Sequence, residues 1–335
     1  MKHTILVTGA GGYIGSVATY VFLQNGYNVV AADNFSTGYR RPIEELQKKF
    51  GNNALKMYET DLKQISTVFE KEQNIDVVVH YAASCLVDES VKNPYKYFDN
   101  NVGGTNDLLK AMTDANVLRL VFSSTCAVYG EAQYMPIDEK HPLAPSQPYG
   151  ASKQMVEELI KWYSQLKKLN YVILRYFNVC GATDDGLIGD SKKPSSLLMQ
   201  NAVRGALNIE PFALTCPEVD TPDKTPIRDY VNVVDLNEAH LKALEHLMAG
   251  KSSEIINLGT GTGNSVLEII TQVKKITGAA FAVEKSTPRQ GDDAKKIADI
   301  AKAKQVLGWV PKRSIADSVN ALVKWYKAHP TGWEQ

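Results

Sequence analysis

The feature that most constrains this sequence is a glycine-rich turn near the N-terminus, between an expected strand and an expected helix. A short apolar run at 4–7 is followed by Gly9, Gly12 and Gly15, and residues 16–25 then carry apolar side chains at helical intervals. A strand, a glycine turn and a helix in this order are typical of the βαβ unit that binds a dinucleotide. The N-terminal part of the chain is therefore expected to form a parallel α/β sheet.

The three glycines and the acidic residue that follows them predict which dinucleotide is bound. Gly9 is expected to permit a tight turn, Gly12 to let the backbone approach a pyrophosphate, and Gly15 to let the helix pack closely. The free N–H groups at the start of the helix would face the phosphates. A second expected strand at 27–32 ends at Asp33, whose carboxylate suits ribose hydroxyls and repels a 2′-phosphate. The pattern therefore predicts NAD rather than NADP.

Further segments are expected to reach the same cofactor. The turn at 34–38 is expected to wrap the adenosine, and Asp61, after the next expected strand, to meet the adenine. The continuous apolar run at 76–83 predicts a buried parallel strand, and its small exit residues leave room for a cofactor. Within this strand, His80 is expected to be a core residue rather than a catalytic one.

A tyrosine and a lysine four residues apart form the candidate reactive pair. Tyr149 and Lys153 lie on one face if their segment opens a helix. An ammonium beside a phenol favours phenolate and lowers a pKa of about 10, which would make Tyr149 a proton acceptor. Alone, such a pair is also typical of an ordinary helix surface. However, the hydroxyl residues 123–125 end another expected strand, at the edge where open α/β sheets bind ligands.

Composition excludes several classes of protein. Of the 335 residues, 37 are Lys or Arg and 37 are Asp or Glu, so the net charge is zero. The sequence has no stripe of basic residues interleaved with aromatics, and nucleic-acid binding is therefore not expected. No apolar run approaches the roughly 20 residues that span a membrane. The cysteines Cys85, Cys126, Cys180 and Cys216 have no metal-binding or CxxC spacing. We therefore expect free thiols, no metal and a cytoplasmic location.

In combination, these motifs resemble the extended short-chain dehydrogenase/reductase superfamily, and most closely its UDP-galactose (UDP-glucose) 4-epimerases. The three-residue glycine spacing is the one that this superfamily uses. The matching stretches run from residue 4 to 309 and cover nearly the whole chain. They include T-G-A-G-G-Y-I-G at 8–15, D-N-F-S-T-G at 33–38, H-Y-A-A at 80–83, E-S-V-K-N-P at 89–94, N-N-V-G-G-T at 100–105, F-S-S-T at 122–125, V-Y-G at 128–130, Y-G-A-S-K at 149–153, L-R-Y-F-N-V at 174–179, R-D-Y-V-N-V-V-D-L at 228–236, N-L-G-T-G-T-G-N-S-V at 257–266 and L-G-W at 307–309.

The resemblance implies a Rossmann-type doubly wound parallel sheet with a smaller α/β C-terminal substrate lobe. Residues 1–180 and the return segment 229–262 would form the NAD-binding domain, and 181–228 with 263–335 the nucleotide-sugar-binding domain. In the sequence pattern, 231–234 and 254–258 are expected to be strands that return to the main sheet, and 197–207 is expected to be helical. The implied activity is a nucleotide-sugar 4-epimerase that interconverts UDP-glucose and UDP-galactose by reversible hydride transfer from sugar C4 to tightly bound NAD. A homodimer is also implied, with the helices at 97–112 and 149–166 as candidate contacts.

The resemblance also assigns roles residue by residue. Tyr149 would take the proton of the 4-hydroxyl, Lys153 would hold the nicotinamide ribose, and Thr125, with Ser124 beside it, would hydrogen-bond the 4-oxygen. The implied cofactor contacts are Gly9, Gly12, Tyr13, Ile14, Gly15, Asp33, Asn34, Phe35, Ser36, Thr37, Gly38, Asp61, Leu62, Tyr81, Ala82, Ala83, Asn100, Ser123, Tyr149, Lys153 and Phe177. The implied substrate contacts are Thr125, Tyr149, Asn178, Leu198, Arg228, Arg289 and Asp292.

Several departures from the family pattern concern the substrate rather than the hydride chemistry. The segment 215–225 differs from the family's run, and Leu197 stands where Asn or His is expected. Cys85 stands where the family has Lys, and Lys296 where it has Tyr, Cys or Leu near the sugar. A different nucleotide sugar, even an acidic one, is therefore an alternative substrate. Equally, Lys296 could be a solvated lysine on a shifted loop.

Two other functions share parts of this pattern. A nucleotide-sugar 4,6-dehydratase would carry Asp-Glu after its threonine, whereas Cys126 and Ala127 occupy those places and argue against it. A non-catalytic NAD-sensing protein would use the same cleft to bind a partner. Such proteins often lose one member of the Tyr149–Lys153 pair, and this sequence keeps both.

Overall fold

The centre of the molecule is a sheet of seven parallel strands. The computed structural model describes residues 3–192, 195–285 and 293–333. The strand order is β11-β6-β5-β4-β1-β2-β3, so the chain reverses its direction of winding between β1 and β4. This order confirms the predicted doubly wound fold and places the switch point, where such sheets bind ligands, beside the glycine turn. The strands are β1 (Thr4–Thr8), β2 (Asn28–Asp33), β3 (Leu55–Glu59), β4 (Val77–His80), β5 (Arg119–Thr125), β6 (Asn170–Tyr176) and β11 (Glu254–Leu258).

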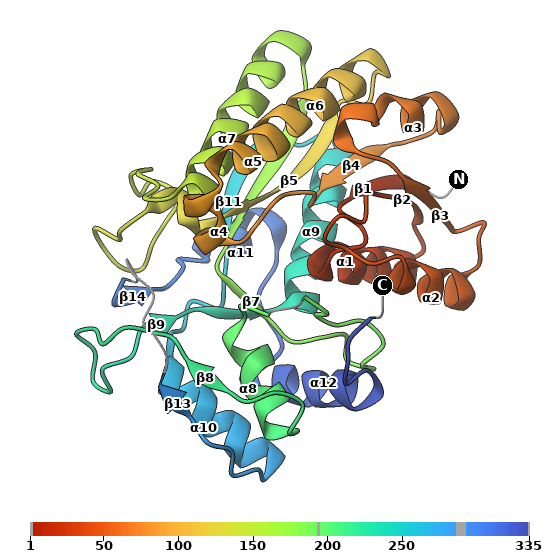
Figure 1. Cartoon of the computed structure of the whole chain (residues 1–335). Helices are drawn as coiled ribbons and strands as arrows, with labels where there is room; N and C mark the ends of the chain where they lie inside the picture. The colour runs from red at the N-terminus through yellow and green to blue at the C-terminus, as the bar shows by residue number, and fades with distance from the viewer. Residues whose placement is uncertain (1–2, 193–194, 286–292, 334–335) are drawn as a thin grey trace.

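Helices cover both faces of the sheet because its strands are apolar on both sides. One core forms where the sheet meets α1 (Tyr13–Gln24), α2 (Arg41–Phe50) and α9 (Val233–Met248), and α11 (Ala301–Leu307) packs beside α9. A second core forms on the opposite face of the sheet, under a separate layer of helices (Figure 1). It is covered by α3 (Ser66–Lys71), α6 (Gly104–Asp114) and α7 (Pro148–Lys167), preceded by the short helices η1 (Leu62–Gln64), α4 (Val87–Lys92) and α5 (Pro94–Tyr97) and the π-helical turn η2 (Phe98–Gly103).

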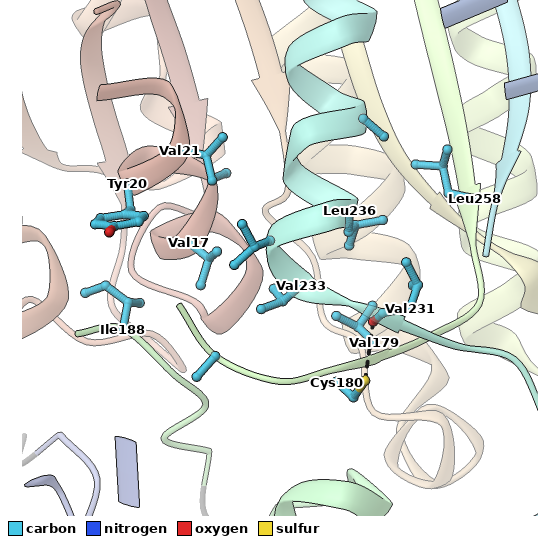
Figure 2. Close-up of a cluster of buried hydrophobic side chains, with 14 of the residues drawn as sticks. Val17, Tyr20, Val21, Val179, Cys180, Ile188, Val231, Val233, Leu236 and Leu258 are labelled. Carbon is cyan, nitrogen blue, oxygen red and sulfur yellow. Dashed lines mark hydrogen bonds between the residues drawn. The ribbon is translucent and has the colours of Figure 1, made fainter. Parts of the chain in front are cut away.

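The segment after residue 230 differs from its prediction. A strand returning to the main sheet was expected at 231–234, but β10 (Tyr230–Asn232) instead pairs with β7 (Asn178–Cys180) in a separate two-stranded sheet. The Asn232 side chain accepts a hydrogen bond from the Val234 N–H at 2.8 Å and caps α9, which ends the strand. Figure 2 shows the start of α9 packed beside α1, above β7 and β10.

The remaining elements gather below the main sheet (Figure 1). Helix α8 (Leu198–Ala206) confirms the predicted helical stretch and packs with α10 (Val266–Thr277) and α12 (Ile315–Ala328). The division into two domains stays a prediction. In the described part of the chain, no helix has both the length and the apolar character needed to cross a membrane. The small strands here are β8 (Ala213–Leu214) with β13 (Glu284–Lys285), and β9 (Ile227–Arg228) with β12 (Asn264–Ser265) and β14 (Lys295–Lys296).

Candidate active site

The glycine turn has the geometry that its spacing predicts. Gly9 has φ +72°, and a Cβ there would lie 2.5 Å from the Ala82 nitrogen. A Cβ on Gly15 would lie 2.1 Å from the carbonyl oxygen of Gly9. The start of α1 therefore approaches the turn so closely that only glycine fits at position 15. At Gly12 the nearest atom would be 3.4 Å away. The backbone at Gly12 is therefore open to a close-lying ligand.

The carboxylate of Asp33 fixes the turn against β2. It accepts hydrogen bonds from the N–H groups of Gly11 at 2.8 Å and of Phe35 at 2.7 Å. Burial raises the pKa of Asp33, and these two hydrogen bonds oppose the rise. A carboxylate has about four acceptor positions, so two remain for a ligand hydroxyl. The Phe35 side chain packs against Gly11 and under the Arg40 guanidinium, 4.7 Å from its ring centroid.

A cavity of about 810 Å³ lies over the glycine turn and the carboxyl ends of the strands. This volume is in the range of cofactor and ligand sites, roughly 300–1,000 Å³. Most of the predicted cofactor residues line it together, whereas Phe35 and Ser123 do not, and neither does Ser124, which was predicted at the catalytic centre. The predicted residues in its wall are Gly9, Gly12, Tyr13, Ile14, Gly15, Asp33, Asn34, Ser36, Thr37, Gly38, Asp61, Leu62, Tyr81, Ala82, Ala83, Asn100, Thr125, Tyr149, Lys153, Phe177 and Asn178.

Tyr149 and Lys153 lie in the first turns of α7, at the wall of this cavity. Tyr149 is 9% exposed, and burial raises its pKa well above the usual value, with a hydrogen bond from Thr125 as the opposing contribution. The lowered pKa that we predicted is therefore not found. The Lys153 ammonium instead donates to the carbonyl oxygen of Ser123 at 2.8 Å. Burial also lowers the pKa of Lys153, to about 8, which weakens its influence on the phenol.

The three hydroxyl residues at the end of β5 have three different environments. Thr125 lines the cavity and accepts a hydrogen bond from the Ala127 N–H at 3.2 Å, capping the short helix η3 (Cys126–Tyr129). The Ser123 hydroxyl is hydrogen-bonded to Nε2 of His240 at 3.0 Å. Ser124 was predicted beside Thr125 at the catalytic centre, but successive residues of a strand face opposite sides. This part of the prediction is therefore corrected.

Ser124 belongs to a buried ion-pair network behind the site. Its hydroxyl donates to Oε1 of Glu157 at 2.5 Å. The same carboxylate accepts from Arg175 Nε at 3.0 Å and from Nη2 at 2.5 Å. The network joins β5, α7 and β6, so it holds the helix that carries Tyr149 against the strand that carries Thr125.

The core assignment of His80 is confirmed. Its two ring nitrogens are hydrogen-bonded to the hydroxyls of Thr8 at 2.6 Å and Thr105 at 2.9 Å. Burial lowers the pKa of His80 to about 3, so the ring is neutral near pH 7. Behind Asn100, the Asn101 amide exchanges hydrogen bonds with the backbone of Ser84 at 2.8 and 3.0 Å and shapes the chain that leaves β4.

Three of the predicted substrate residues, Asn178, Leu198 and Arg228, line a smaller hollow of about 130 Å³ that adjoins the cavity, whereas Thr125 and Tyr149 line the cavity itself. Asn178 and Leu197 line both spaces. Thr215 and Cys216, from the segment that departs from the family pattern, are also in its wall. The Arg228 guanidinium donates to the carbonyl oxygen of Asp293 at 2.8 Å. Arg289 and Asp292 lie outside the described residues, so their roles stay predictions.

Lys296 is not a solvated lysine. It lies on β14 in register with Arg228, its side chain is 19% exposed, and it forms an ion pair with Asp293. It also lies close enough to Cys126 to lower the pKa of that thiol, although burial raises this pKa more strongly. A second cation is thus held beside Arg228.

Sequence reasoning missed one part of the wall. The loop at 189–192 and Trp333, near the C-terminus, both line the large cavity. Neither segment has a periodic pattern or a motif that we used, and they come together only through contacts distant in sequence. The backbone N–H of Trp333 donates to the Ser191 hydroxyl at 2.6 Å. A tail residue therefore supports a loop that borders the predicted cofactor site.

Known proteins with similar sequences and structures match nearly the whole chain. A UDP-glucose 4-epimerase of Lactobacillus helveticus is 42% identical over 334 residues, covering 98% of this chain and 99% of the relative. A crystal structure of UDP-glucose 4-epimerase from Bifidobacterium longum in complex with NAD+ and UDP has a TM-score of 0.93 at 34% identity, covering 98% and 100% of the two chains. A UDP-glucose-4-epimerase structure from Stenotrophomonas maltophila, with bound NAD and formylated UDP-arabinopyranose, has a TM-score of 0.92 at 35% identity, covering 97% and 98%.

The family assignment agrees with the geometry. The sequence profile of the NAD dependent epimerase/dehydratase family matches residues 5–259, which include the glycine turn, the hydroxyl residues of β5 and the Tyr149–Lys153 pair. The chain belongs to the NAD dependent epimerase/dehydratase family.

Proposed function

We propose that this protein is a nucleotide-sugar 4-epimerase that interconverts UDP-glucose and UDP-galactose with bound NAD. The observation that carries the proposal is the meeting of Tyr149, Lys153 and Thr125 with the glycine turn in one cavity. Relatives named as UDP-glucose 4-epimerases along the full chain length support it. We further propose that 1–180 with 229–262 form the NAD domain and 181–228 with 263–335 the nucleotide-sugar domain.

The residues of the cavity fit NAD. Gly12 leaves its backbone open to a pyrophosphate, and the N-terminus of α1 offers N–H groups to it. Asp33 keeps acceptor positions for ribose hydroxyls, and its charge disfavours a 2′-phosphate. Lys153 would hold the nicotinamide ribose. When bound, NAD supplies a cationic ring that accepts a hydride and returns it.

Tyr149 is proposed as the base that takes the proton of the 4-hydroxyl. Its raised pKa means that the phenol is protonated in the unliganded cavity. Positive charge near the ring favours phenolate, and Lys153, one turn away on the same face of α7, contributes such charge while it is protonated. Thr125 would hydrogen-bond the 4-oxygen, and its bond to Tyr149 keeps the two hydroxyls together. A positioned base of this kind is worth about 10²–10⁴-fold in rate.

The smaller hollow is proposed to receive the nucleotide. Asn178, Leu198 and Arg228 would contact it, with Arg228 on the diphosphate because a guanidinium binds phosphate oxygens in pairs. Arg289 and Asp292 are proposed to complete these contacts. A different nucleotide sugar is the second candidate substrate, because the cation of Lys296 is held beside Arg228. Lys296 would favour a sugar with an acidic substituent.

The test is a panel of UDP- and dTDP-sugars, assayed for inversion at C4 by NMR with the purified protein and no added cofactor. We expect UDP-glucose and UDP-galactose to interconvert, and the absorbance of reduced cofactor to stay constant. Turnover of a UDP-hexuronic acid instead would select the second candidate. Stoichiometric consumption of the cofactor, or NAD binding without turnover of any sugar, would reject a 4-epimerase. The latter result is the one expected of an NAD-sensing protein.

A homodimer in the cytoplasm is proposed as the working form. Helix α7 exposes Met155, Trp162 and Leu166 at helical spacing, with Trp162 59% and Leu166 71% exposed. Tyr95 of α5, a helix that packs against α7, is also exposed. Large apolar side chains that gather on one face mark an interface. The four cysteines are free thiols, as expected in a reducing compartment.

A further inference from the structure

A lysine that motif analysis did not select projects into the large cavity. Lys192 Nζ donates to Cys85 Sγ at 3.0 Å, and both residues line the cavity. Cys85 follows β4, whereas Lys192 lies in the loop before α8, so the contact joins two loops distant in sequence. An ammonium has three donors, and a thiol is a weak acceptor. Among the hydrogen bonds of the described residues, this is the one that Lys192 Nζ donates.

The backbone that carries Lys192 is fixed on three sides. The Tyr39 hydroxyl donates to the carbonyl oxygen of Ser191 at 3.0 Å, and the Trp333 N–H donates to the Ser191 hydroxyl at 2.6 Å. The Trp325 indole donates to the carbonyl oxygen of Asp190 at 3.1 Å. Asp190 and Ser191 are both buried. A side chain supported in this way is presented at a defined position, as binding residues are.

The acidic groups near Lys192 have other partners. The Asp190 carboxylate accepts from the Lys192 backbone N–H at 3.2 Å and from the Ser195 hydroxyl at 3.0 Å. The Glu89 carboxylate, in the wall of the same cavity, is bound by the Lys96 ammonium at 2.8 Å. The charge of Lys192 is therefore not neutralised by a direct ion pair within the described residues. It faces a space in which an anion can replace the thiol as its acceptor.

We propose that the Lys192 ammonium binds the diphosphate oxygens of a ligand in this cavity. The inference rests on the proposed function, which supplies two such diphosphates, one in the nucleotide sugar and one in the dinucleotide. A lysine ammonium binds phosphate as a compact point charge. The lysine that the family pattern places at position 85 is a cysteine here. Lys192 brings an ammonium to the same point from the facing loop.

The experiment compares the full-length protein, as purified with its cofactor, with Lys192→Met and with the exposed control Lys242→Met. Calorimetric titrations measure the affinities for UDP and for uridine. Mass spectrometry measures the amount of NAD that copurifies and stays bound through dialysis. Loss of a charge-assisted hydrogen bond predicts roughly 10-fold to 100-fold weaker UDP binding. Uridine binding is expected to be unchanged. Lys192→Met/Cys85→Lys is expected to restore UDP binding, because it returns an ammonium to the same point.

The outcomes separate the two sources of phosphate. Weaker UDP binding with full NAD retention assigns Lys192 to the nucleotide sugar, and loss of NAD with normal UDP binding to the holoprotein assigns it to the dinucleotide. Unchanged UDP binding and NAD retention in Lys192→Met and in Lys192→Gln, both folded by circular dichroism, would overturn the proposal. If the wild type binds neither UDP nor NAD, the proposed function is rejected, and the assignment of a diphosphate ligand to Lys192 is rejected with it.

Discussion

Replacement of Arg175 by methionine is expected to destabilise the protein severely, because it leaves a buried carboxylate without its cation. Glu157 is fully buried and is bound by Arg175 through Nε at 3.0 Å and Nη2 at 2.5 Å. After the change, the Ser124 hydroxyl would be its remaining partner among the described residues. Breaking a buried ion pair in this way costs about 3–5 kcal/mol. That is a large share of the roughly 5–15 kcal/mol that stabilises a typical protein.

The assay is equilibrium unfolding in urea, followed by far-UV circular dichroism at a fixed NAD concentration, since a bound ligand shifts the apparent stability. The double variant Arg175→Met/Glu157→Leu removes both charges and is expected to recover most of the loss, because an apolar pair often replaces a buried ion pair without cost. Lys242→Met, which breaks a surface pair with Glu245, is the control and is expected to change the stability by less than about 1 kcal/mol. The reasoning is refuted if Arg175→Met costs less than about 1 kcal/mol, or if the double variant is as unstable as the single one.

Two further predictions concern the site and its core. Tyr149→Phe is expected to keep its bound NAD but to lose about 10²–10⁴-fold in turnover of UDP-galactose, and near-normal turnover would remove Tyr149 from the mechanism. Because the pKa of His80 is about 3 in the folded protein and near ~6.5 when unfolded, the unfolded state binds the additional proton between these values. The stability that depends on neutral His80 is therefore complete above about pH 6.5 and is lost as the pH falls, at about 1.4 kcal/mol per unit. Between pH 6 and pH 5, the free energy of unfolding in urea should therefore decrease less in His80→Gln than in the wild type, by roughly this amount. Equal decreases in the two proteins would contradict the assignment.

The parallel sheet and its cofactor edge could be predicted because their signals are local. A strand, a glycine turn and a helix follow one another within a few residues, and apolar runs mark buried strands. The end of β10 could not be predicted in this way. Asn232 ends the strand by capping α9, although the apolar residues on either side of it are equally compatible with a longer strand.

The errors at the site have a similar origin. Ser124 was grouped with Thr125 because the two are adjacent in sequence, but the partner that decides its role is Glu157, on another helix. The raised pKa of Tyr149 depends on burial by several elements, whereas the sequence shows its spacing from Lys153 alone. Lys192 and Trp333 reach the cavity through contacts with Cys85 and Ser191, and no local pattern reports such contacts.

The end of β5 has a consequence for engineering this protein. Three consecutive residues there accept a hydrogen bond from Lys153, hold α7 through Glu157 and line the cavity, so a substitution made there to widen the substrate range risks disturbing all three roles. The hollow beside Leu198 and Arg228 is built from other parts of the chain. Libraries aimed at new sugars or nucleotides should therefore randomise the residues of the hollow and leave residues 123–125 intact. Substrate binding could then change without disturbing the residues around the Tyr149–Lys153 pair.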